Sequence, residues 1–331
     1  MPDRGPYSNY RLTARLAFKN TPGPFASVTS LLARQRVNLG AVDIVEVTRD
    51  KMVRDITFDV ADEEHGERVI AALRALKAVK VVSVSDRIFL MHLGGKLQVH
   101  SRYPITTRNR LSMVYTPGVA RVAKAIAEDR GKVHALTVKR NTVAVVTDGS
   151  AVLGLGNLGP EAALPVMEGK AMIFKEFAGI DAWPICLATQ DPEEVVETVQ
   201  RIAPVFGGIN LEDISAPRCF AIEERLRTTL DIPVMHDDQH GTAIVVLAAL
   251  KNALRILRKD IRKIRVVVSG TGAAGTACCQ MLLAAGVRHL LGCSRHGVVL
   301  DTHRANLRAM KRNLLMHVHR ERPGMSLREA L

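Results

Sequence analysis

The sequence predicts a mixed α/β protein in which a small antiparallel sandwich precedes a larger part built on a parallel sheet. Over residues 10–92, four strand-like runs and two helical patterns follow one another in the order βαββαβ, which is typical of a ferredoxin-like sandwich. From about residue 95 onwards, short apolar runs alternate with helical patterns, as in an α/β fold with a largely parallel sheet. The 331 residues are enough for two or three domains.

Two periodicities predict the elements of the N-terminal segment. Apolar and polar residues alternate over 10–19, which predicts a strand, and Phe25, Val28 and Leu31 recur at helical spacing. Further strands are expected over 41–48, 52–60 and 79–90, and a second helix over 65–77. The segment holds no cluster of acids, histidines or cysteines, so we expect a ligand-sensing or dimerising module without catalysis.

Gly94 and Gly95 indicate a domain boundary, and we predict domains over 10–92, 95–258 and 259–331. Buried strands are expected at 142–147, 183–188, 207–211, 233–235 and 264–269, and helices begin near 191, 216, 240 and 273. In a parallel sheet of this kind, ligands bind at the carboxyl ends of the strands.

Charge is distributed unevenly along the chain. The net charge is +13, and residues 255–331 contain 15 Lys and Arg against four Asp and Glu. A polyanion such as nucleic acid is one explanation for this basic segment, and a solvated surface is the other. Since no aromatic residue interleaves with these charges, the segment lacks stacking platforms for single strands. We predict no nucleic-acid partner.

Hydrophobicity and cysteine content bear on the cellular compartment. The sequence has no apolar run long enough to span a bilayer, and its first residues, MPDRGPYSNYRLTARL, lack the apolar stretch of a signal peptide. Five cysteines without a C-x-x-C pair do not indicate a disulfide framework. These features predict a cytoplasmic location and no membrane partner.

The motif G-x-G-x-x-G occurs twice, at 154–159 and at 270–275. At the second site an apolar strand leads directly into Gly270 and a helical pattern without proline follows, so backbone N–H groups at the helix start can face a pyrophosphate. At the first site Pro160 and Pro165 interrupt the following segment. We assign dinucleotide binding to the second motif. The first is a tight loop, and one packed beside a substrate remains an alternative.

The second motif also predicts an acid at the end of the next strand, where it would bind ribose hydroxyls. That strand is expected over 287–293, and Ser294 and Arg295 follow it without an acid. Arg295 would suit the 2′-phosphate of NADP, or it is simply exposed. The cofactor-binding residues that we predict are Gly270, Gly272, Ala273, Ala274, Gly275, Ser294 and Arg295.

Two pairs of acids, Glu212-Asp213 and Asp237-Asp238, each follow a predicted strand. Because the carboxyl ends of parallel strands share one edge of a sheet, these carboxylates would repel one another unless a cation bound among them. Oxygen ligands suit Mg²⁺ or Mn²⁺. The alternatives are a helix cap at Asp238 and a solvated loop at Glu212-Asp213. For His236 and His240 we expect supporting or capping roles.

Several long motifs, in this order along the chain, resemble those of the malic enzyme family: YTPGVA at 115–120, VLGLGNLGPEAALPVMEGKA at 152–171, NLEDI at 210–214, HDDQHGTA at 236–243 and VVVSGTGAAG at 266–275. The βαββαβ segment resembles an ACT regulatory domain, as in bacterial malic enzymes that carry one in front. The resemblance covers roughly residues 10–300.

The resemblance implies oxidative decarboxylation of L-malate to pyruvate and CO₂, with reduction of NAD or NADP. It implies that Glu212, Asp213 and Asp238 hold Mg²⁺ or Mn²⁺ and that the catalytic residues are Tyr115, Lys170 and Asp237. Lys170 would take the hydroxyl proton, Tyr115 would protonate the enolpyruvate carbon, and Asp237 would tune Lys170. Near helix N-termini and a metal, Lys170 is expected to have a lowered pKa. Homodimers or larger homo-oligomers, and a small-molecule effector at the ACT domain, are also implied.

Three departures from the family pattern leave an alternative open. Ser294 stands where family members usually carry an acid, and the family continues well past this chain's end with the rest of the dinucleotide-binding domain. After Gly297 the sequence is basic without an apolar strand to pair, although 305–319 is compatible with an amphipathic helix. The alternative is a truncated, catalytically impaired homologue that acts as an ACT-type sensing or oligomerising protein.

Overall fold

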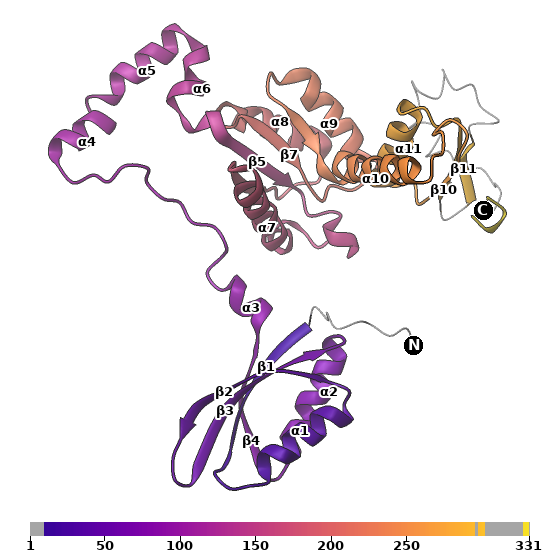
Figure 1. Ribbon diagram of the computed structural model, residues 1–331. Helices are drawn as coiled ribbons and strands as arrows, with labels where there is room; N and C mark the ends of the chain where they lie inside the picture. The colour runs from indigo at the N-terminus through magenta and orange to yellow at the C-terminus, as the bar shows by residue number, and fades with distance from the viewer. Residues whose placement is uncertain (1–9, 295–296, 302–326, 331) are drawn as a thin grey trace. The chain divides into compact units, whose positions relative to one another are not determined.

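The computed structural model describes residues 10–294, 297–301 and 327–330. The chain divides into two compact units, residues 1–96 and residues 97–331, which are shown in Figure 1. Arg295 and the predicted helix over 305–319 lie outside the described residues. Among the described residues, no helix is long and apolar enough to cross a membrane.

The first unit is a four-stranded antiparallel sheet with two helices on one face (Figure 1). Its elements are β1 (Tyr10–Lys19), α1 (Pro24–Arg34), β2 (Asn38–Val47), β3 (Lys51–Val60), α2 (Glu63–Arg74), β4 (Val79–Asp86) and α3 (Arg87–His92). The strand order is β2-β3-β1-β4. Alternate residues of β1, among them Ala14 and Leu16, pack with Val28 and Leu73 of the helices. The predicted βαββαβ sandwich is confirmed.

The end of the last strand differs from the prediction. The sequence predicts a strand over 79–90, whereas β4 ends at Asp86 and α3 follows. The carboxylate of Asp86 accepts the backbone N–H of Ile88 at 2.7 Å, so an N-cap turns the apolar residues that follow into a short helix.

The second unit contains a parallel four-stranded sheet in the order β6-β5-β7-β8. Helices precede it as α4 (Arg108–Val114), α5 (Val119–Glu128), η1 (Arg130–Lys132), α6 (Val133–Leu136) and η2 (Val138–Asn141). The sheet and its helices are β5 (Thr142–Thr147), η3 (Val152–Gly154), α7 (Pro160–Ala178), β6 (Asp181–Cys186), α8 (Pro192–Ile202), η4 (Ala203–Val205), β7 (Gly208–Leu211), α9 (Arg218–Thr229), β8 (Val234–His236) and α10 (Asp237–Ile256). Val146, Leu211, Ile222 and Leu226 are central in its core.

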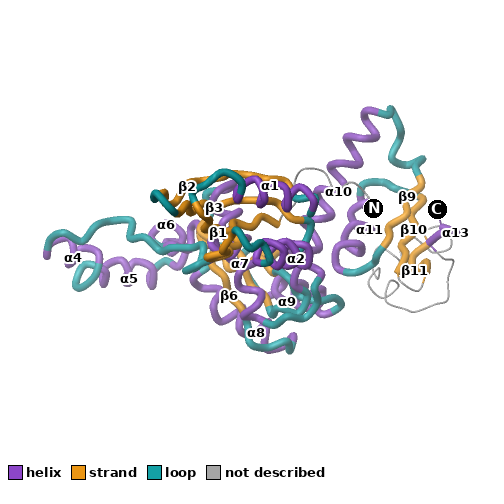
Figure 2. Tube along the Cα trace, turned by 90° about the horizontal axis from the view of Figure 1, so that it is seen from below, coloured by secondary structure: helices purple, strands orange, loops and turns teal. Residues whose placement is uncertain are grey.

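A smaller sheet follows α10, with β9 (Arg265–Ser269), α11 (Ala273–Ala284), β10 (His289–Ser294), β11 (Gly297–Asp301) and α13 (Leu327–Ala330). Its order is β11-β10-β9, with β9 and β10 parallel, and Figure 2 shows the three strands side by side. Leu282 and Leu290 pack with Leu247 and Leu250 of α10. The predicted absence of a strand after Gly297 was wrong, because β11 pairs antiparallel with β10. The fold class predicted from sequence, with a partial dinucleotide-binding domain at this end, is confirmed.

Candidate active site

The register of the parallel sheet brings the two acid pairs together. Leu211 of β7 is paired with His236 of β8, so Glu212-Asp213 and Asp237-Asp238 leave the same edge of the sheet on neighbouring strands. Glu212 and Asp213 enter a loop, whereas Asp237 and Asp238 form the first turn of α10. The helix start favours negative charge there through its unpaired N–H groups.

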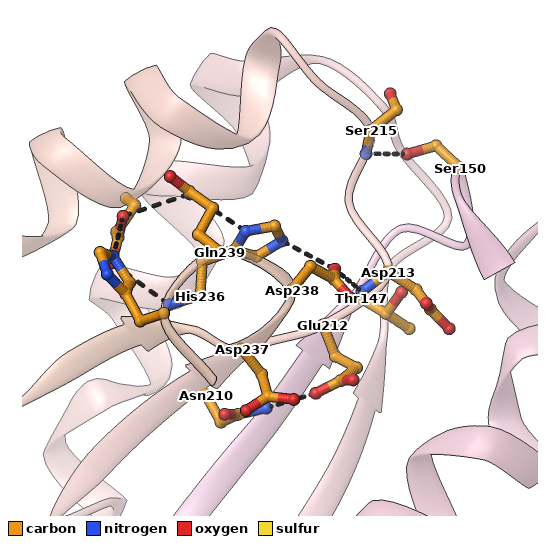
Figure 3. A network of polar contacts seen from close by, with 12 residues as sticks. Thr147, Ser150, Asn210, Glu212, Asp213, Ser215, His236, Asp237, Asp238 and Gln239 are labelled. Carbon is orange, nitrogen blue, oxygen red and sulfur yellow. Dashed lines mark hydrogen bonds and ion pairs between the residues drawn. The ribbon is translucent and has the colours of Figure 1, made fainter. Parts of the chain in front are cut away.

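Three of these carboxylates form a compact cluster. Glu212, Asp213 and Asp238 each offer an oxygen atom, and these atoms lie within 4.8 Å of one another. Asp213 has a left-handed backbone, with φ 54°, and its N–H donates to Asp238 Oδ2 at 3.0 Å. Its own Oδ1 accepts the N–H of Leu153 at 3.4 Å, while Oδ2 is buried without a hydrogen-bond partner in the described part of the chain. Figure 3 shows the cluster.

Burial makes this cluster electrostatically unfavourable by itself. It raises the pKa of Glu212 from 4.5 to about 7, with the charges of Asp237 and Asp238 adding to the effect and Lys170 opposing it. It also raises the pKa of Asp213, which faces Asp238. An unpartnered carboxylate oxygen among three crowded acids fits a hard divalent cation, which oxygen ligands hold in proteins.

Lys170 lies at the same centre but not where the sequence suggested. Its Nζ is 2.7 Å from Asp237 Oδ2 and 3.2 Å from Glu212 Oε1. Burial by itself would lower the pKa of Lys170, but the hydrogen bond to Asp237 and the charges of Glu212 and Asp237 prevail and raise it. The residue lies in the middle of α7 rather than at a helix start, and the lowered pKa expected for it is not found among these carboxylates.

Tyr115 lies between α4 and α5, directly after Val114. Its side chain is 67% exposed, and no hydrogen bond or ion pair between Tyr115 and the acid cluster is found among the described residues. The structure thus brings Lys170, Asp237 and the three clustered acids together, and among the described residues it shows no polar contact that links Tyr115 to them.

The two glycine motifs form different structures. Gly270, with φ 97°, follows β9, and Gly272 is the N-cap of α11, so Ala273 and Ala274 open the helix. A Cβ on Gly275 would lie 1.7 Å from the oxygen of Gly270, so only glycine allows this close packing. Ser294 ends β10.

The first motif belongs to a loop whose preceding residues, Ala151 and Leu153, bond to Asp213. The N–H groups of Ala151 and Leu153 donate to the backbone oxygen and to Oδ1 of Asp213. Pro160 occupies the first position of α7, and Pro165 lies inside this helix instead of ending it. The loop therefore borders the candidate centre, in keeping with the alternative that it packs beside a substrate.

The site also contains Asn210, Gln239 and Glu223, for which the sequence predicted no role, beside His236 and His240, for which it predicted a supporting or capping one. Asn210 Nδ2 donates to Glu212 Oε2 at 2.9 Å. Behind Asp238, the side chains of His236, Gln239, His240 and Glu223 form a buried polar network. Glu223 is only 5% exposed, and nothing in the sequence distinguished it from the adjacent Glu224 of the same helix.

Three models of known protein families match the chain. Residues 94–227 match the model of the malic enzyme N-terminal domain, and residues 239–304 match that of the malic enzyme NAD binding domain. Residues 7–83 match an ACT domain. The chain belongs to the malic enzyme family. The resemblance inferred from its motifs is confirmed.

Individual malic enzymes are similar over much of the chain. An NAD-dependent malic enzyme of Geobacillus stearothermophilus is 56% identical over 288 residues, covering 87% of this chain and 60% of the relative. The NADP-dependent malic enzyme of Escherichia coli is 47% identical, over 66% of this chain and 29% of the relative. The chain thus spans less than two thirds of these malic enzymes.

Solved structures of malic enzymes share the fold. The NAD-dependent malic enzyme of Thermotoga maritima superposes with a TM-score of 0.67 at 47% identity, over 75% of this chain and 66% of that one. The malic enzyme of Pyrococcus horikoshii gives a TM-score of 0.62 at 49% identity, over 64% of this chain and 51% of that one.

Proposed function

We propose that this malic enzyme chain catalyses oxidative decarboxylation of L-malate to pyruvate and CO₂, with reduction of NAD or NADP and dependence on Mg²⁺ or Mn²⁺. The proposal rests on Lys170, which forms ion pairs with Glu212 and Asp237 beside the cluster of three acids at one edge of the sheet. We also propose the domain division 10–92, 95–258 and 259–331 for this function.

Glu212, Asp213 and Asp238 are proposed to hold the metal. Their donor atoms are all carboxylate oxygens, and the buried Oδ2 of Asp213 has no other partner among the described residues. When bound, a divalent cation supplies Lewis-acid polarisation to the hydroxyl and carboxylate oxygens of a 2-hydroxy acid. The loop from Ala151 to Leu153, which bonds Asp213, would border the bound substrate.

Lys170 is the proposed base for the malate hydroxyl as hydride passes to the nicotinamide. Since the neighbouring carboxylates raise its pKa, Lys170 must first release a proton, and Asp237 at 2.7 Å is an acceptor within direct reach. Tyr115 is the proposed acid that protonates the enolpyruvate carbon. In support, its side chain is exposed and makes no described hydrogen bond.

The nicotinamide cofactor is proposed to bind at Gly270, Gly272, Ala273, Ala274 and Gly275, where the N-terminus of α11 can receive the pyrophosphate. Ser294 ends the neighbouring strand without an acid, which weakens the usual preference for NAD, and Arg295 would suit the 2′-phosphate of NADP. Relatives of both kinds, NAD-dependent and NADP-dependent, are similar to this chain.

Self-association into a homodimer or a larger assembly is proposed as well, with a small-molecule effector at the ACT domain. In support, the edge strand β2 exposes Ile44 and Val47, and an edge strand carries unpaired backbone groups that can extend the sheet into a second copy.

The test is an absorbance assay of reduced nicotinamide with L-malate, Mn²⁺ and either NAD or NADP, run beside Lys170→Ala. We expect reduction with at least one cofactor and its loss in the variant. Full activity of Lys170→Ala would refute the proposed base. No turnover with either cofactor, together with intact Mn²⁺ binding, would favour the alternative of an impaired homologue that senses ligands through its ACT domain.

A further inference from the structure

We propose that His236, fixed in one tautomer by Gln239 and Glu223, is a positioning residue that holds Asp238 in the orientation required of a metal ligand. This inference rests on the metal site proposed above. Figure 3 shows the polar contacts that lead from Gln239 through His236 to Asp238.

Glu223 of α9 is the buried anchor of this network. His240 Nε2 lies 2.7 Å from its Oε1 and 3.0 Å from its Oε2. Oε1 also accepts the backbone N–H of His236 at 3.2 Å, and Oε2 accepts Nε2 of Gln239 at 3.3 Å. A carboxylate that is surrounded by donors fixes the direction of each of them.

The amide of Gln239 then determines the tautomer of His236. Its Nε2 lies 3.0 Å from His236 Nδ1 in addition to its bond to Glu223. An amide nitrogen carries two hydrogens, and the flipped amide would turn its oxygen toward the Glu223 carboxylate. The nitrogen therefore donates to both, Nδ1 acts as an acceptor, and a neutral His236 carries its hydrogen on Nε2.

The Nε2–H of His236 faces Asp238. The imidazole is completely buried, and Nε2 lies 3.1 Å from Asp238 Oδ2 without forming a regular hydrogen bond. Oδ2 also accepts the N–H of Asp213 at 3.0 Å. Both contacts are made to Oδ2, and no described hydrogen bond is made to Oδ1.

The carboxylate of Asp238 is thus held from one side. Because Oδ2 is held by the protein, we assign Oδ1 to the cluster that Asp238 forms with Glu212 and Asp213. Partners behind a metal ligand commonly contribute about 10- to 100-fold to metal affinity, because they fix its orientation and basicity. His236 acts through Asp238 and is not itself a ligand in this scheme.

The test measures Mn²⁺ binding by the electron paramagnetic resonance signal of the free ion, without substrate or turnover. For His236→Met, of similar volume and without donors, we expect Kd to rise about tenfold. His236→Gln retains an N–H near the position of Nε2 and should recover part of the loss. Gln239→Met should also weaken Mn²⁺ binding. The double variant His236→Met/Gln239→Met should bind no more weakly than His236→Met, because Gln239 acts on Asp238 only through His236.

Controls separate this inference from the metal site itself. His65→Met is the matched control and should leave Kd unchanged. His65 belongs to the first unit, where both of its ring nitrogens have hydrogen-bond partners. If wild type binds no Mn²⁺, or if Asp238→Asn binds it normally, the proposed metal site is wrong. If Asp238→Asn abolishes binding but folded His236→Met retains the wild-type Kd, the positioning role is overturned.

The tautomer of His236 can be measured in the wild-type protein, so this result does not depend on the stability of a variant. Long-range ¹H–¹⁵N correlation spectra of ¹⁵N-histidine protein identify which ring nitrogen carries the hydrogen, and the His236 signals are those missing in His236→Gln. We expect the hydrogen on Nε2. A hydrogen on Nδ1 would overturn the proposal, because Nε2 would then face Asp238 as a second acceptor.

Discussion

The Nζ of Lys170 and the Oδ2 of Asp237 lie 2.7 Å apart, although the two residues are separated by 67 positions along the chain. One belongs to the middle of α7 and the other to the first turn of α10. Both side chains are partly buried, so their interaction is screened less than that of a surface pair. This ion pair joins the candidate proton-transfer group to the strand end that carries the acids.

Asp237→Asn should change how Lys170 titrates. The hydrogen bond and the charge of Asp237 both raise the pKa of Lys170, so their removal should lower that pKa and shift the acid limb of the kcat profile to lower pH. The kcat itself should fall by roughly 10- to 100-fold, because the ammonium loses its orienting partner. Initial rates of nicotinamide reduction across the pH range measure both effects.

Asp181→Asn is the matched control for that variant, since Asp181 pairs with Lys175 at 2.6 Å on the exposed surface. Neither the pH profile nor kcat should change in it. An unshifted acid limb in Asp237→Asn would show that another group than Lys170 controls the profile.

Glu212→Gln should stabilise the protein at neutral pH in the presence of a chelator. Burial raises the pKa of Glu212 from 4.5 to about 7, so the favourable contribution of its protonated form is complete below 4.5 and is lost as the pH rises through 7. The variant should be more stable than wild type by roughly 1–3 kcal/mol above that range, and the difference should vanish in acid.

Thermal unfolding at both ends of this pH range measures the effect. Glu197→Gln, at an exposed acid of α8, should shift the unfolding temperature equally at both. A constant difference between Glu212→Gln and wild type across the range would mean that Glu212 titrates in the folded protein as it does in the unfolded chain.

The acid cluster could be predicted because it depends on local features of the sequence. Glu212-Asp213 and Asp237-Asp238 each follow a short apolar strand, and parallel strands place such ends together. The same reasoning failed for Lys170, because Pro165 was taken to interrupt a helix. At the sixth position of α7, a proline removes only a hydrogen bond close to the helix start, so the helix continues and carries Lys170 to the acids.

Tertiary pairing was outside the reach of sequence reasoning. Glu223 precedes His236 by 13 residues, and no periodicity links an acid of one helix to the imidazole of a strand end. The strand β11 was also missed, because the five residues from Gly297 to Asp301 are too few to display a period. Motifs supported a role for Tyr115, but they could not specify its placement on an exposed segment.

Gly149→Ala should disturb the candidate metal site from outside it. A Cβ at this position would lie 2.2 Å from the carbonyl carbon and oxygen of Gly159, and the backbone φ is +68°. The loop from 149 to 159 must therefore move, and the N–H groups of Ala151 and Leu153 that bond Asp213 move with it. We expect a loss of about 2 kcal/mol or more in stability and weaker Mn²⁺ binding.

Gly154→Ala separates backbone strain from steric conflict in the same loop. Its φ is +78°, but nothing lies within 4 Å of the added Cβ. We therefore expect only the strain of a left-handed backbone conformation at alanine, about 1 kcal/mol, and normal Mn²⁺ binding. Equal effects of the two substitutions, measured by thermal unfolding and Mn²⁺ titration, would contradict the steric argument.

Substitutions in the second glycine motif should distinguish a folding role from a binding role. A Cβ on Gly275 would lie 1.7 Å from the oxygen of Gly270, whereas nothing lies within 4 Å of a Cβ on Gly272. Gly275→Ala should therefore lower the unfolding temperature, because α11 can no longer pack against the end of β9. Gly272→Ala should leave that temperature unchanged and weaken binding of reduced nicotinamide dinucleotide about tenfold or more, because its methyl group occupies the approach of the pyrophosphate. Fluorescence titration with the reduced dinucleotide measures the second effect. Wild-type affinity in a folded Gly272→Ala protein would show that the cofactor does not bind at the N-terminus of α11. Since a Cβ at position 272 would meet no neighbouring atom, packing does not require glycine there. Close approach of the pyrophosphate does.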